Sequence, residues 1–333
     1  MKAFFFEHYG KHSPLRFGDR PEPAMGDNDV LIDVHAASLN QLDAKIKSGA
    51  FKMIFPHAMP LILGQDMAGV VLKTGARVTQ FQPGDAVYGC LPPSRMGTFA
   101  ERVVADARYL ARKPQNLSME EAASLPLVAL TAWQAFNAIA KVQPGQRVFI
   151  QAGSGGVGTV AIQLAKHLGA SVATTAGAAS SEKLMRLGAD AVFDYRKDDF
   201  SATLKDYDVA LMSQDAASLA QSLSILKRGG TAISISGPPD PAFARQAGLN
   251  PFLQFIMWAR SYRVRAGARR AGLEYTFLFM QPQGDQLRQL TALIESGAIH
   301  PVIDKVFPFD QTAEAMAYLE TGRAKGKVVV KIR

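Results

Sequence analysis

Cysteine is almost absent from this sequence, since Cys90 is the only one among 333 residues. One cysteine cannot form an internal disulfide, and it cannot supply the thiolates of a structural zinc site. The sequence also has no apolar run near the roughly 20 residues of a membrane-spanning helix, and Glu7 and His8 interrupt the apolar N-terminal stretch early. These absences argue against a disulfide framework, a signal peptide and a membrane span. They predict a soluble cytoplasmic protein.

Acidic residues are outnumbered by basic ones, 29 to 37, which gives a net charge of +8. Such an excess suits an anionic cofactor or a nucleic acid. The basic residues are dispersed except for a cluster that consists of Arg260, Arg263, Arg265, Arg269 and Arg270. This cluster is compatible with phosphate binding and equally with a solvated or subunit-facing segment. Because the other basic residues are dispersed, we do not expect a nucleic-acid partner, and without a membrane-spanning segment we do not expect a membrane partner.

Short extended segments broken by Gly and Pro dominate the first hundred residues. The predicted strands are Lys2–Glu7, Val30–Ser38, Gly69–Thr74, Ala86–Gly89 and Phe99–Ala105, and the first helix is Asn40–Ser48. This pattern predicts a partly barrel-like β domain.

From about residue 120 helices and strands alternate, which predicts an α/β domain with a parallel sheet covered on both faces. The predicted helices are Met119–Leu125, Ala129–Ala140, 159–169, Gly284–Ser296 and Gln311–Gly322. The predicted strands are 147–152, 171–176, 191–194, 207–212, 231–236 and Lys327–Ile332. The aromatic and basic segment 240–275 has no clear assignment.

A glycine fingerprint lies between the predicted strand 147–152 and the predicted helix 159–169. Gly153, Gly155 and Gly158 form a G-x-G-x-x-G turn. In such a turn the first glycine permits the bend, the second lets the backbone approach a pyrophosphate, and the third allows close packing of helix on strand. The helix N-terminus then faces the phosphates. The strand–turn–helix context predicts a dinucleotide site.

The end of the second predicted strand, 171–176, indicates which dinucleotide binds. An NAD site has an acidic residue there, whereas this chain has no carboxylate before Glu182. Hydroxyl and cationic groups follow instead, from Ser180, Ser181, Lys183, Tyr195 and Arg196. They suit a 2′-phosphate. We therefore predict NADPH as the cofactor.

The glycine motif and several flanking motifs resemble the quinone oxidoreductase branch of the medium-chain dehydrogenase/reductase superfamily. The flanking matches are Gly64-Gln-Asp-Met-Ala-Gly-Val-Val71, Phe81-Gln-Pro-Gly-Asp-Ala-Val-Tyr-Gly89, Leu125-Pro-Leu-Val-Ala-Leu-Thr-Ala132 and Gly322-Arg-Ala-Lys-Gly-Lys-Val-Val329. The stretches 277–280 and 282–287 further resemble NADPH-dependent alkenal and quinone reductases.

This resemblance implies a Rossmann doubly wound parallel sheet plus a GroES-like β domain. The expected division is a first catalytic part at 1–122, a Rossmann NADP-binding domain at 123–265 and a return to the catalytic domain at 266–333. It also implies a homodimer, joined through the edges of the Rossmann domains.

The zinc alcohol dehydrogenases of the same superfamily have cysteine and Gly-His-Glu at positions that correspond here to Asn40 and Gly64-Gln65-Asp66. Amide and lone carboxylate groups do not form the N/S site that zinc favours. The six histidines, at 8, 12, 35, 57, 167 and 300, show no ligand spacing. We therefore expect no metal. The expected reaction is hydride transfer from the nicotinamide to an acceptor that is already electrophilic, namely a quinone, an enal or an enone.

The resemblance also implies the site residues. Asn40, Asp43 and Thr131 would lie near the nicotinamide, although Asp43 is equally compatible with a structural hydrogen-bond acceptor. The expected cofactor-binding residues are Val128, Gly153, Ser154, Gly155, Gly156, Val157, Gly158, Ser180, Lys183, Tyr195, Arg196, Ser236, Gly237 and Lys327. The expected substrate pocket consists of Phe51, Tyr88, Phe277 and Phe279, with Trp258 as a further candidate. These aromatic residues are also compatible with plain core positions.

One departure from the family pattern narrows the reaction. Related enzymes commonly have Gly-x-Tyr where this chain has Gly49-Ala50-Phe51. Phenylalanine shapes an apolar pocket but cannot donate a proton. This lowers the expectation of an enoyl-thioester reductase, which stays an alternative. A non-enzymatic protein that binds NADPH, or nucleic acid through its arginines, is a second alternative.

Overall fold

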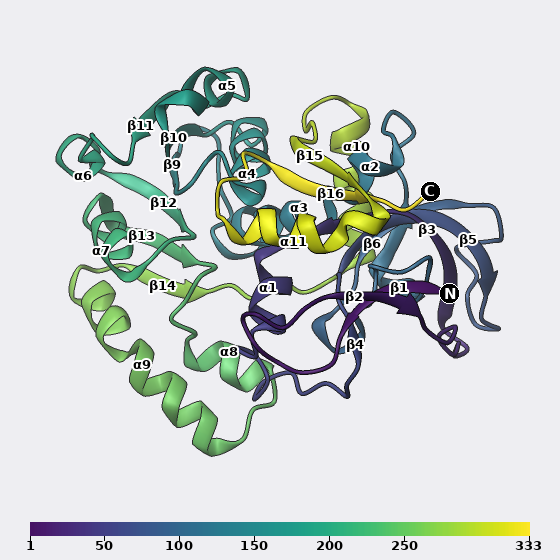
Figure 1. Cartoon of the computed structure of the whole chain (residues 1–333). Coiled ribbons are helices and arrows are strands. Elements are labelled where there is room, and N and C mark those ends of the chain that lie inside the picture. Colours follow the sequence, from purple (N-terminus) through teal and green to yellow (C-terminus); the bar gives the residue numbers. More distant parts are fainter. The chain divides into compact units, whose positions relative to one another are not determined.

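The computed structural model describes the backbone of residues 1–333 and the side chains of all of them except Ala216 and Ala217. The chain forms two units (Figure 1). Unit 1 contains Met1–Leu130 and Gln281–Arg333, and unit 2 contains Thr131–Met280. The sequence analysis instead places the divisions at 122/123 and 265/266.

Unit 1 is built on antiparallel strands. A seven-stranded sheet has the order β15-β16-β3-β5-β6-β8, with β7 also paired to β3, and a three-stranded sheet has the order β2-β1-β4. The strands are β1 Lys2–Phe6, β2 Arg16–Asp19, β3 Asp29–Leu39, β4 Leu61–Ile62, β5 Asp66–Thr74, β6 Ala86–Cys90, β7 Arg102–Asp106, β8 Leu110–Arg112, β15 Ile303–Pro308 and β16 Lys327–Lys331. The helices are α1 Gln41–Lys47, α2 Met119–Ala123, α10 Gly284–Glu295 and α11 Thr312–Glu320, while α3 Pro126–Trp133 begins in unit 1 and ends in unit 2.

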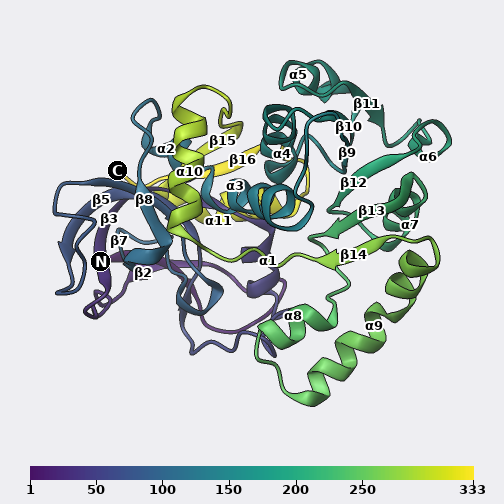
Figure 2. The same cartoon turned by 180° about the vertical axis from the view of Figure 1, so that it is seen from behind.

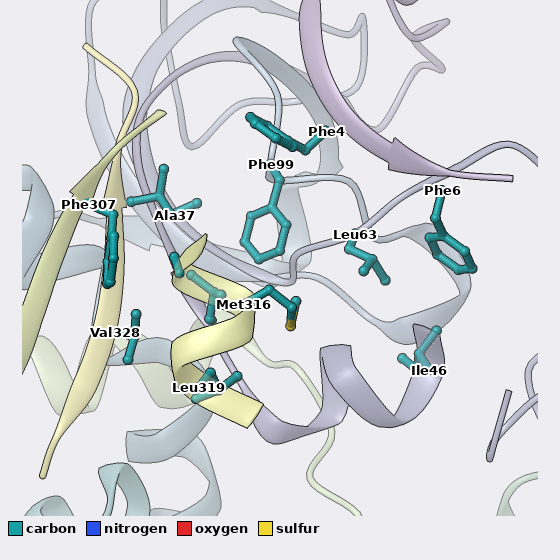
Figure 3. Packing of buried hydrophobic residues seen from close by; sticks show 13 residues of the cluster. Phe4, Phe6, Ala37, Ile46, Leu63, Phe99, Phe307, Met316, Leu319 and Val328 are labelled. Atoms are coloured by element: carbon teal, nitrogen blue, oxygen red, sulfur yellow. The ribbon is translucent and has the colours of Figure 1, made fainter. Parts of the chain in front are cut away.

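Strand β3 joins distant parts of the chain within unit 1. It pairs antiparallel with β5, β7 and the C-terminal β16. The close crossing of β3 and β5 requires Gly69, because a Cβ there would lie 2.1 Å from the Asp33 carbonyl oxygen. Beside it, a buried apolar cluster joins residues from both ends of the sequence, including Phe4, Phe99, Phe307 and Met316 (Figure 3).

Unit 2 is a doubly wound α/β domain. Its six strands run parallel in the order β11-β10-β9-β12-β13-β14. The strands are β9 Arg147–Ile150, β10 Ser171–Ala176, β11 Ala191–Asp194, β12 Tyr207–Met212, β13 Leu226–Ser234 and β14 Glu274–Phe277. The helices that connect them are α4 Gly156–His167, α5 Ser181–Arg186, α6 Phe200–Thr203, α7 Ala216–Ser224, α8 Pro241–Gln246 and α9 Pro251–Arg270. The predicted fold class is therefore confirmed.

The unassigned segment 240–275 forms helices α8 and α9 and the first two residues of the edge strand β14 of unit 2 (Figure 2). Asp240 caps α8 by accepting from the Phe243 N–H, and Asn250 caps α9 by accepting from the Leu253 N–H. Because β14 pairs with β13, the segment up to Met280 belongs to unit 2. This pairing explains why the structural division follows residue 280 and not residue 265.

The segment after residue 125 also differs from its predicted helix. Pro126 begins α3 three residues before the predicted start, and proline is favoured in the first helical turn. After Trp133 the backbone continues as a wider π-helical stretch, Gln134–Ile139.

Candidate active site

The glycine turn of unit 2 follows strand β9 and opens helix α4. A Cβ at Gly153 would lie 2.2 Å from the Thr174 hydroxyl oxygen, and one at Gly158 would lie 2.5 Å from the Ala152 carbonyl oxygen. Packing inside the protein therefore requires both glycines. A Cβ at Gly155 would meet only the Ala152 carbonyl oxygen, at 3.4 Å. Gly155 thus leaves open the approach of a ligand to the backbone.

The first turn of α4 fits a pyrophosphate group. Gly155 is the N-cap and contributes no side-chain cap to the helix N–H groups. Ser154, Gly156 and Val157 are half-buried and therefore accessible. Free N–H groups at the positive end of a helix of this length attract anions. The predicted residues of this turn are thus held in a form that can bind the phosphates of a dinucleotide.

Polar groups gather where β10 and β11 end. Ala176 and Asp194, the last residues of the two strands, are paired in register. The side chains of Tyr195 and Arg196 lie over Gly177, where a Cβ would be 3.9 and 4.0 Å from their nearest atoms. The Arg196 guanidinium is 5.1 Å from the centre of the Tyr195 ring, and both side chains are exposed.

Two further predicted residues, Ser180 and Lys183, lie on the segment that follows Gly177. Ser180 is the N-cap position of α5 and is buried, and Lys183 is half-buried in the first turn of that helix. The carboxylate of Asp194 accepts from the Arg196 backbone N–H at 3.1 Å. The segment after β10 therefore offers hydroxyl and cationic groups, as the sequence predicts.

Gln151 holds the loop that follows β12 at the same edge of the sheet. Its side-chain oxygen accepts from the N–H groups of Ser213 and Gln214 at 3.0 and 3.1 Å, and its amide donates to the Ser222 hydroxyl at 2.7 Å. The Ser236 hydroxyl donates to the Gln214 carbonyl oxygen at 2.6 Å. The predicted pair Ser236 and Gly237 thus lies on a loop that is braced through Gln151, a residue that sequence reasoning missed.

A buried polar network lies in unit 1 around Asp66. The Asp66 Oδ2 accepts from the Ser38 hydroxyl at 3.0 Å and the Asn40 side-chain amide at 2.9 Å, and it lies 3.2 Å from the Lys327 Nζ. The other oxygen, Oδ1, accepts from the Leu127 N–H at 2.8 Å, in the first turn of α3. The carboxylate therefore faces a buried cation and the positive end of a helix.

Asn40 and Lys327, two of the predicted site residues, meet in this network. Lys327 Nζ donates to the Asn40 Oδ1 at 2.5 Å and to the Leu39 carbonyl oxygen at 3.1 Å. All three ammonium hydrogens thus have acceptors within the protein, counting Asp66. One amide hydrogen of Asn40 donates to Asp66, which fixes the orientation of that amide. The structure gives Lys327 the role of holding Asn40 in place.

Asp43 is fully buried in helix α1. Its Oδ2 accepts from the Asn40 backbone N–H at 2.8 Å and caps the helix start, while its Oδ1 has no hydrogen-bond partner among the described groups. Burial raises the pKa of this carboxyl to about 7, and the neighbouring charge of Asp66 acts in the same direction. Asp43 therefore titrates near neutral pH inside the protein.

The predicted aromatic residues of unit 1 occupy two environments. Phe51 is half-buried after α1, stacks with Phe55 at a centroid distance of 6.2 Å and packs on the cluster of Figure 3. Tyr88 is fully buried in β6, and its hydroxyl donates to the Leu287 carbonyl oxygen at 2.9 Å. Burial raises the pKa of this phenol. Tyr88 thus fastens α10 to the sheet from a core position.

Phe277 and Phe279 pack together with Phe243 in unit 2, at centroid distances of 5.2 and 5.4 Å from it. Trp258 instead lies exposed on α9. The remaining predicted residues, Val128 and Thr131, are both buried in α3.

Among the described residues, no group of three or more His, Cys, Asp or Glu side chains is placed to hold a metal ion. Cys90 is buried next to Asp66, and burial raises the pKa of its thiol. No described helix has the length and apolar character needed to cross a membrane.

Two protein families match the chain. Residues 26–115 match the alcohol dehydrogenase GroES-like domain, and residues 187–330 match the family described as zinc-binding dehydrogenase. The two matches follow the order expected from the sequence motifs.

Characterised relatives cover nearly the whole chain. The mitochondrial NAD(P)H oxidoreductase RTN4IP1 of Bos taurus is 35% identical, with 100% of this chain and 89% of the relative covered. The chloroplastic NADPH-dependent alkenal/one oxidoreductase of Arabidopsis thaliana is 34% identical, with 99% and 79% covered. The solved structure of the quinone oxidoreductase from Coxiella burnetii is 33% identical and superposes with a TM-score of 0.87, over 100% and 99% of the two chains.

Proposed function

The chain belongs to the medium-chain dehydrogenase/reductase superfamily, and on that premise we propose that it is an NADPH-dependent reductase of quinones or α,β-unsaturated carbonyls that works without zinc. Its relatives show more generally that it is an NAD(P)H-dependent oxidoreductase. One observation carries the proposal furthest. The G-x-G-x-x-G turn is preserved in three dimensions, with Gly155 open to a ligand.

NADPH is the proposed cofactor because of the groups that follow β10. Ser180, Lys183 and Arg196 can donate to a 2′-phosphate, and the segment 177–181 offers no carboxylate that would repel one. The relative from Arabidopsis thaliana is named as NADPH-dependent. When bound, the nicotinamide supplies the hydride. The glycine turn would hold the pyrophosphate.

The Lys183→Ala/Arg196→Ala variant tests this assignment. Removing two cations from a phosphate should weaken NADPH binding by about 10²-fold, because charge-assisted bonds contribute ~1.5 kcal/mol or more each. NADH binding should change by less than threefold. Dissociation constants from quenching of cofactor fluorescence measure both, with Lys197→Ala as a control on the same exposed loop. Equal losses for the two cofactors would contradict the proposal.

The proposed independence from zinc follows from the donor groups in unit 1. Asn40 stands at the position of a ligand cysteine in the zinc enzymes, and its amide is already bonded to Asp66 and Lys327. Asp66 uses both carboxylate oxygens in hydrogen bonds. The polar atoms of these side chains are therefore already engaged in hydrogen bonds, and an amide is a poor zinc ligand. Prolonged dialysis against a chelator should leave at least about 90% of the activity. A loss of activity that is restored by adding zinc would refute the proposed independence from zinc.

Without a Lewis acid, the acceptor must itself be electrophilic, as quinones, enals and enones are. The proposed catalytic role of Asn40 is a polar contact through its remaining amide hydrogen, with Thr131 and Asp43 as further candidates. Phe51, Phe277 and Phe279 are the proposed apolar pocket residues. We leave Tyr88 out of this pocket because its hydroxyl is fully used in the core.

The reaction is tested by following NADPH oxidation at 340 nm with 1,2- and 1,4-quinones, with enals and with crotonyl-CoA. We expect turnover with quinones or enals to exceed that with crotonyl-CoA. Higher activity on crotonyl-CoA would favour an enoyl-thioester reductase, and no turnover with any acceptor would favour a non-enzymatic NADPH-binding protein. A cytoplasmic homodimer remains a prediction, which gel filtration and fractionation can test.

A further inference from the structure

Gln151 lies directly before the glycine turn of unit 2, where strand β9 ends beside β12. Its backbone N–H donates to the Leu211 carbonyl oxygen in β12 at 2.9 Å. The next residue, Ala152, has a φ of 52°, which residues with a side chain rarely adopt, and there the chain bends into the turn. Gln151 itself is 3% exposed. A side-chain amide that is buried at this point must form its hydrogen bonds within the protein.

The amide group of Gln151 forms every hydrogen bond that an amide can form. Its oxygen accepts from the backbone N–H groups of Ser213 and Gln214 at 3.0 and 3.1 Å. Its nitrogen donates to the Ser222 hydroxyl at 2.7 Å and to the Ser218 carbonyl oxygen at 2.9 Å. A primary amide has two acceptor sites and two donor hydrogens, so all four are used. The side chain therefore has one orientation, and it joins the end of β9 to helix α7 and to the loop after β12.

The loop after β13 is tied to the same place. The hydroxyl of Ser236, an exposed residue, donates to the Gln214 carbonyl oxygen at 2.6 Å. The Ser234 hydroxyl, at the end of β13, accepts from the Gly237 N–H at 3.1 Å and donates to the Gly237 carbonyl oxygen at 2.8 Å. We call residues 213–215 and 235–237 the braced loops. They lie side by side at the carboxyl edge of the sheet, and Gln151 is their buried anchor.

The strand order shows which half of a dinucleotide the braced loops can contact. In a doubly wound sheet the pyrophosphate binds at the glycine turn, and the ribose of the adenosine half binds at the end of the second strand. That second strand is β10, on one side of β9. Strands β12 and β13 lie on the other side of β9 (Figure 1). A dinucleotide held at the glycine turn therefore extends its nicotinamide half, the ring and its ribose, over the braced loops.

We propose that Gln151 is a positioning residue for the nicotinamide half of NADPH. This inference rests on the proposed function, because it takes the cofactor and its phosphate site as given. Gln151 is buried, and its amide bonds are all internal, so it acts through the braced loops and not by contact with the cofactor. The adenosine half, at the ends of β10 and β11, is independent of it.

The Gln151→Leu variant removes the four side-chain hydrogen bonds at similar volume. A displacement of ~1 Å can slow an aligned transfer by about 10²-fold, so we expect kcat to fall by about that factor. The KM for NADPH should change much less, since the orientation of the ring acts on the reaction step. The probe 2′,5′-ADP represents the adenosine half alone, and its dissociation constant should change by less than about threefold.

Two measurements do not depend on turnover. Without cofactor, hydrogen exchange of a peptide that covers 213–215 should be faster in Gln151→Leu, because the Ser213 and Gln214 N–H groups have lost their acceptor. With cofactor, the emission of bound NADPH reports the surroundings of its nicotinamide ring. In Gln151→Leu this emission should move toward that of free NADPH although the cofactor still binds.

Val148→Ala is the matched control on the same strand. Val148 is fully buried in β9, and its truncation lowers the stability of unit 2 while Gln151 keeps its bonds to the braced loops. Its kcat and its NADPH emission should equal those of the unchanged protein. If Gln151→Leu does not fold, Gln151→Asn replaces it, because the amide is then one methylene too short to reach the loop after β12. It should give the same separation of kcat from 2′,5′-ADP binding, to a smaller extent.

Three results would overturn the inference and leave the proposed function intact. They are an unchanged kcat in the Gln151 variant, a loss of 2′,5′-ADP binding as large as the loss of kcat, and an equal loss of kcat in Val148→Ala. Failure of the proposed function is recognised separately, in the unchanged protein. If that protein binds NADPH but reduces no acceptor, the emission and the hydrogen exchange decide the role of Gln151. If it binds no NADPH, both proposals are wrong.

Discussion

Replacing Lys327 with methionine should expose how much the buried network of unit 1 depends on its one cation. Methionine fills a similar volume but donates no hydrogen bond, so Asp66 keeps a buried charge without its partner, and Asn40 and Leu39 lose a donor. Lys327 and Asp66 are 5% and 0% exposed at their side chains. Removal of one partner from a buried pair destabilises by about 3–5 kcal/mol.

Hydrogen exchange of peptides from β3 and β16 is the appropriate assay. Both tryptophans belong to unit 2, so tryptophan fluorescence would not report on unit 1. A loss of 3–5 kcal/mol accelerates exchange through opening by roughly two to four orders of magnitude, at 1.4 kcal/mol per factor of ten. The control is Lys331→Met, since Lys331 lies on the same strand and forms an exposed pair with Glu120 at 3.1 Å. It should change exchange by less than about fivefold.

The double variant Asp66→Asn/Lys327→Met sharpens the test. It leaves no unpaired charge, so it should be more stable than the Lys327→Met variant. An acceleration below tenfold in the single variant, or a double variant as unstable as the sum of the two single ones, would refute the reasoning.

Two further predictions follow from the same two units. The buried Asp43 has a pKa of about 7, above its value of about 4 in an unfolded chain. Between these two values the folded state binds a proton that the unfolded chain has lost, so the free energy of unfolding should fall as the pH rises from about 4 to 7, by up to ~1.4 kcal/mol per pH unit. Asp43→Asn should remove this slope in denaturant titrations, and an unchanged slope would contradict the assignment. Gly153→Ala should destabilise unit 2, because its Cβ would lie 2.2 Å from the Thr174 hydroxyl oxygen. Gly155→Ala should instead fold normally and bind NADPH at least about tenfold more weakly. Thermal melts and cofactor titrations of both variants check this, and intact cofactor binding in Gly155→Ala would contradict the proposed phosphate site.

Sequence patterns were sufficient for the parallel sheet of unit 2. The strands 171–176, 191–194 and 207–212 were predicted with the bounds that the structure shows. Their residues are mostly apolar and lie between short polar turns, so local pattern alone defines them. The glycine turn could likewise be predicted from the sequence, because each glycine has a local physical task.

Helix α9 escaped prediction for a physical reason. Its buried face carries the small residues Ser261 and Ala268 beside Leu253 and Met257, while its large aromatic residues are exposed. The apolar pattern therefore indicates the wrong side. The network around Asp66 was missed for a different reason. Asp66 and Lys327 are separated by 261 positions, and no local pattern reveals such a pairing.

The position of Lys327 also constrains how the protein is made. Synthesis proceeds from the N-terminus, and domains generally fold as units while the chain emerges. Unit 2 is continuous from Thr131 to Met280, whereas unit 1 needs Gln281–Arg333. Asp66 is therefore translated 261 residues before the lysine that neutralises it. Unit 1 is therefore completed only after unit 2 has been translated, and a ribosome that stalls before residue 327 leaves β3 without its partner β16 and Asp66 without its cation.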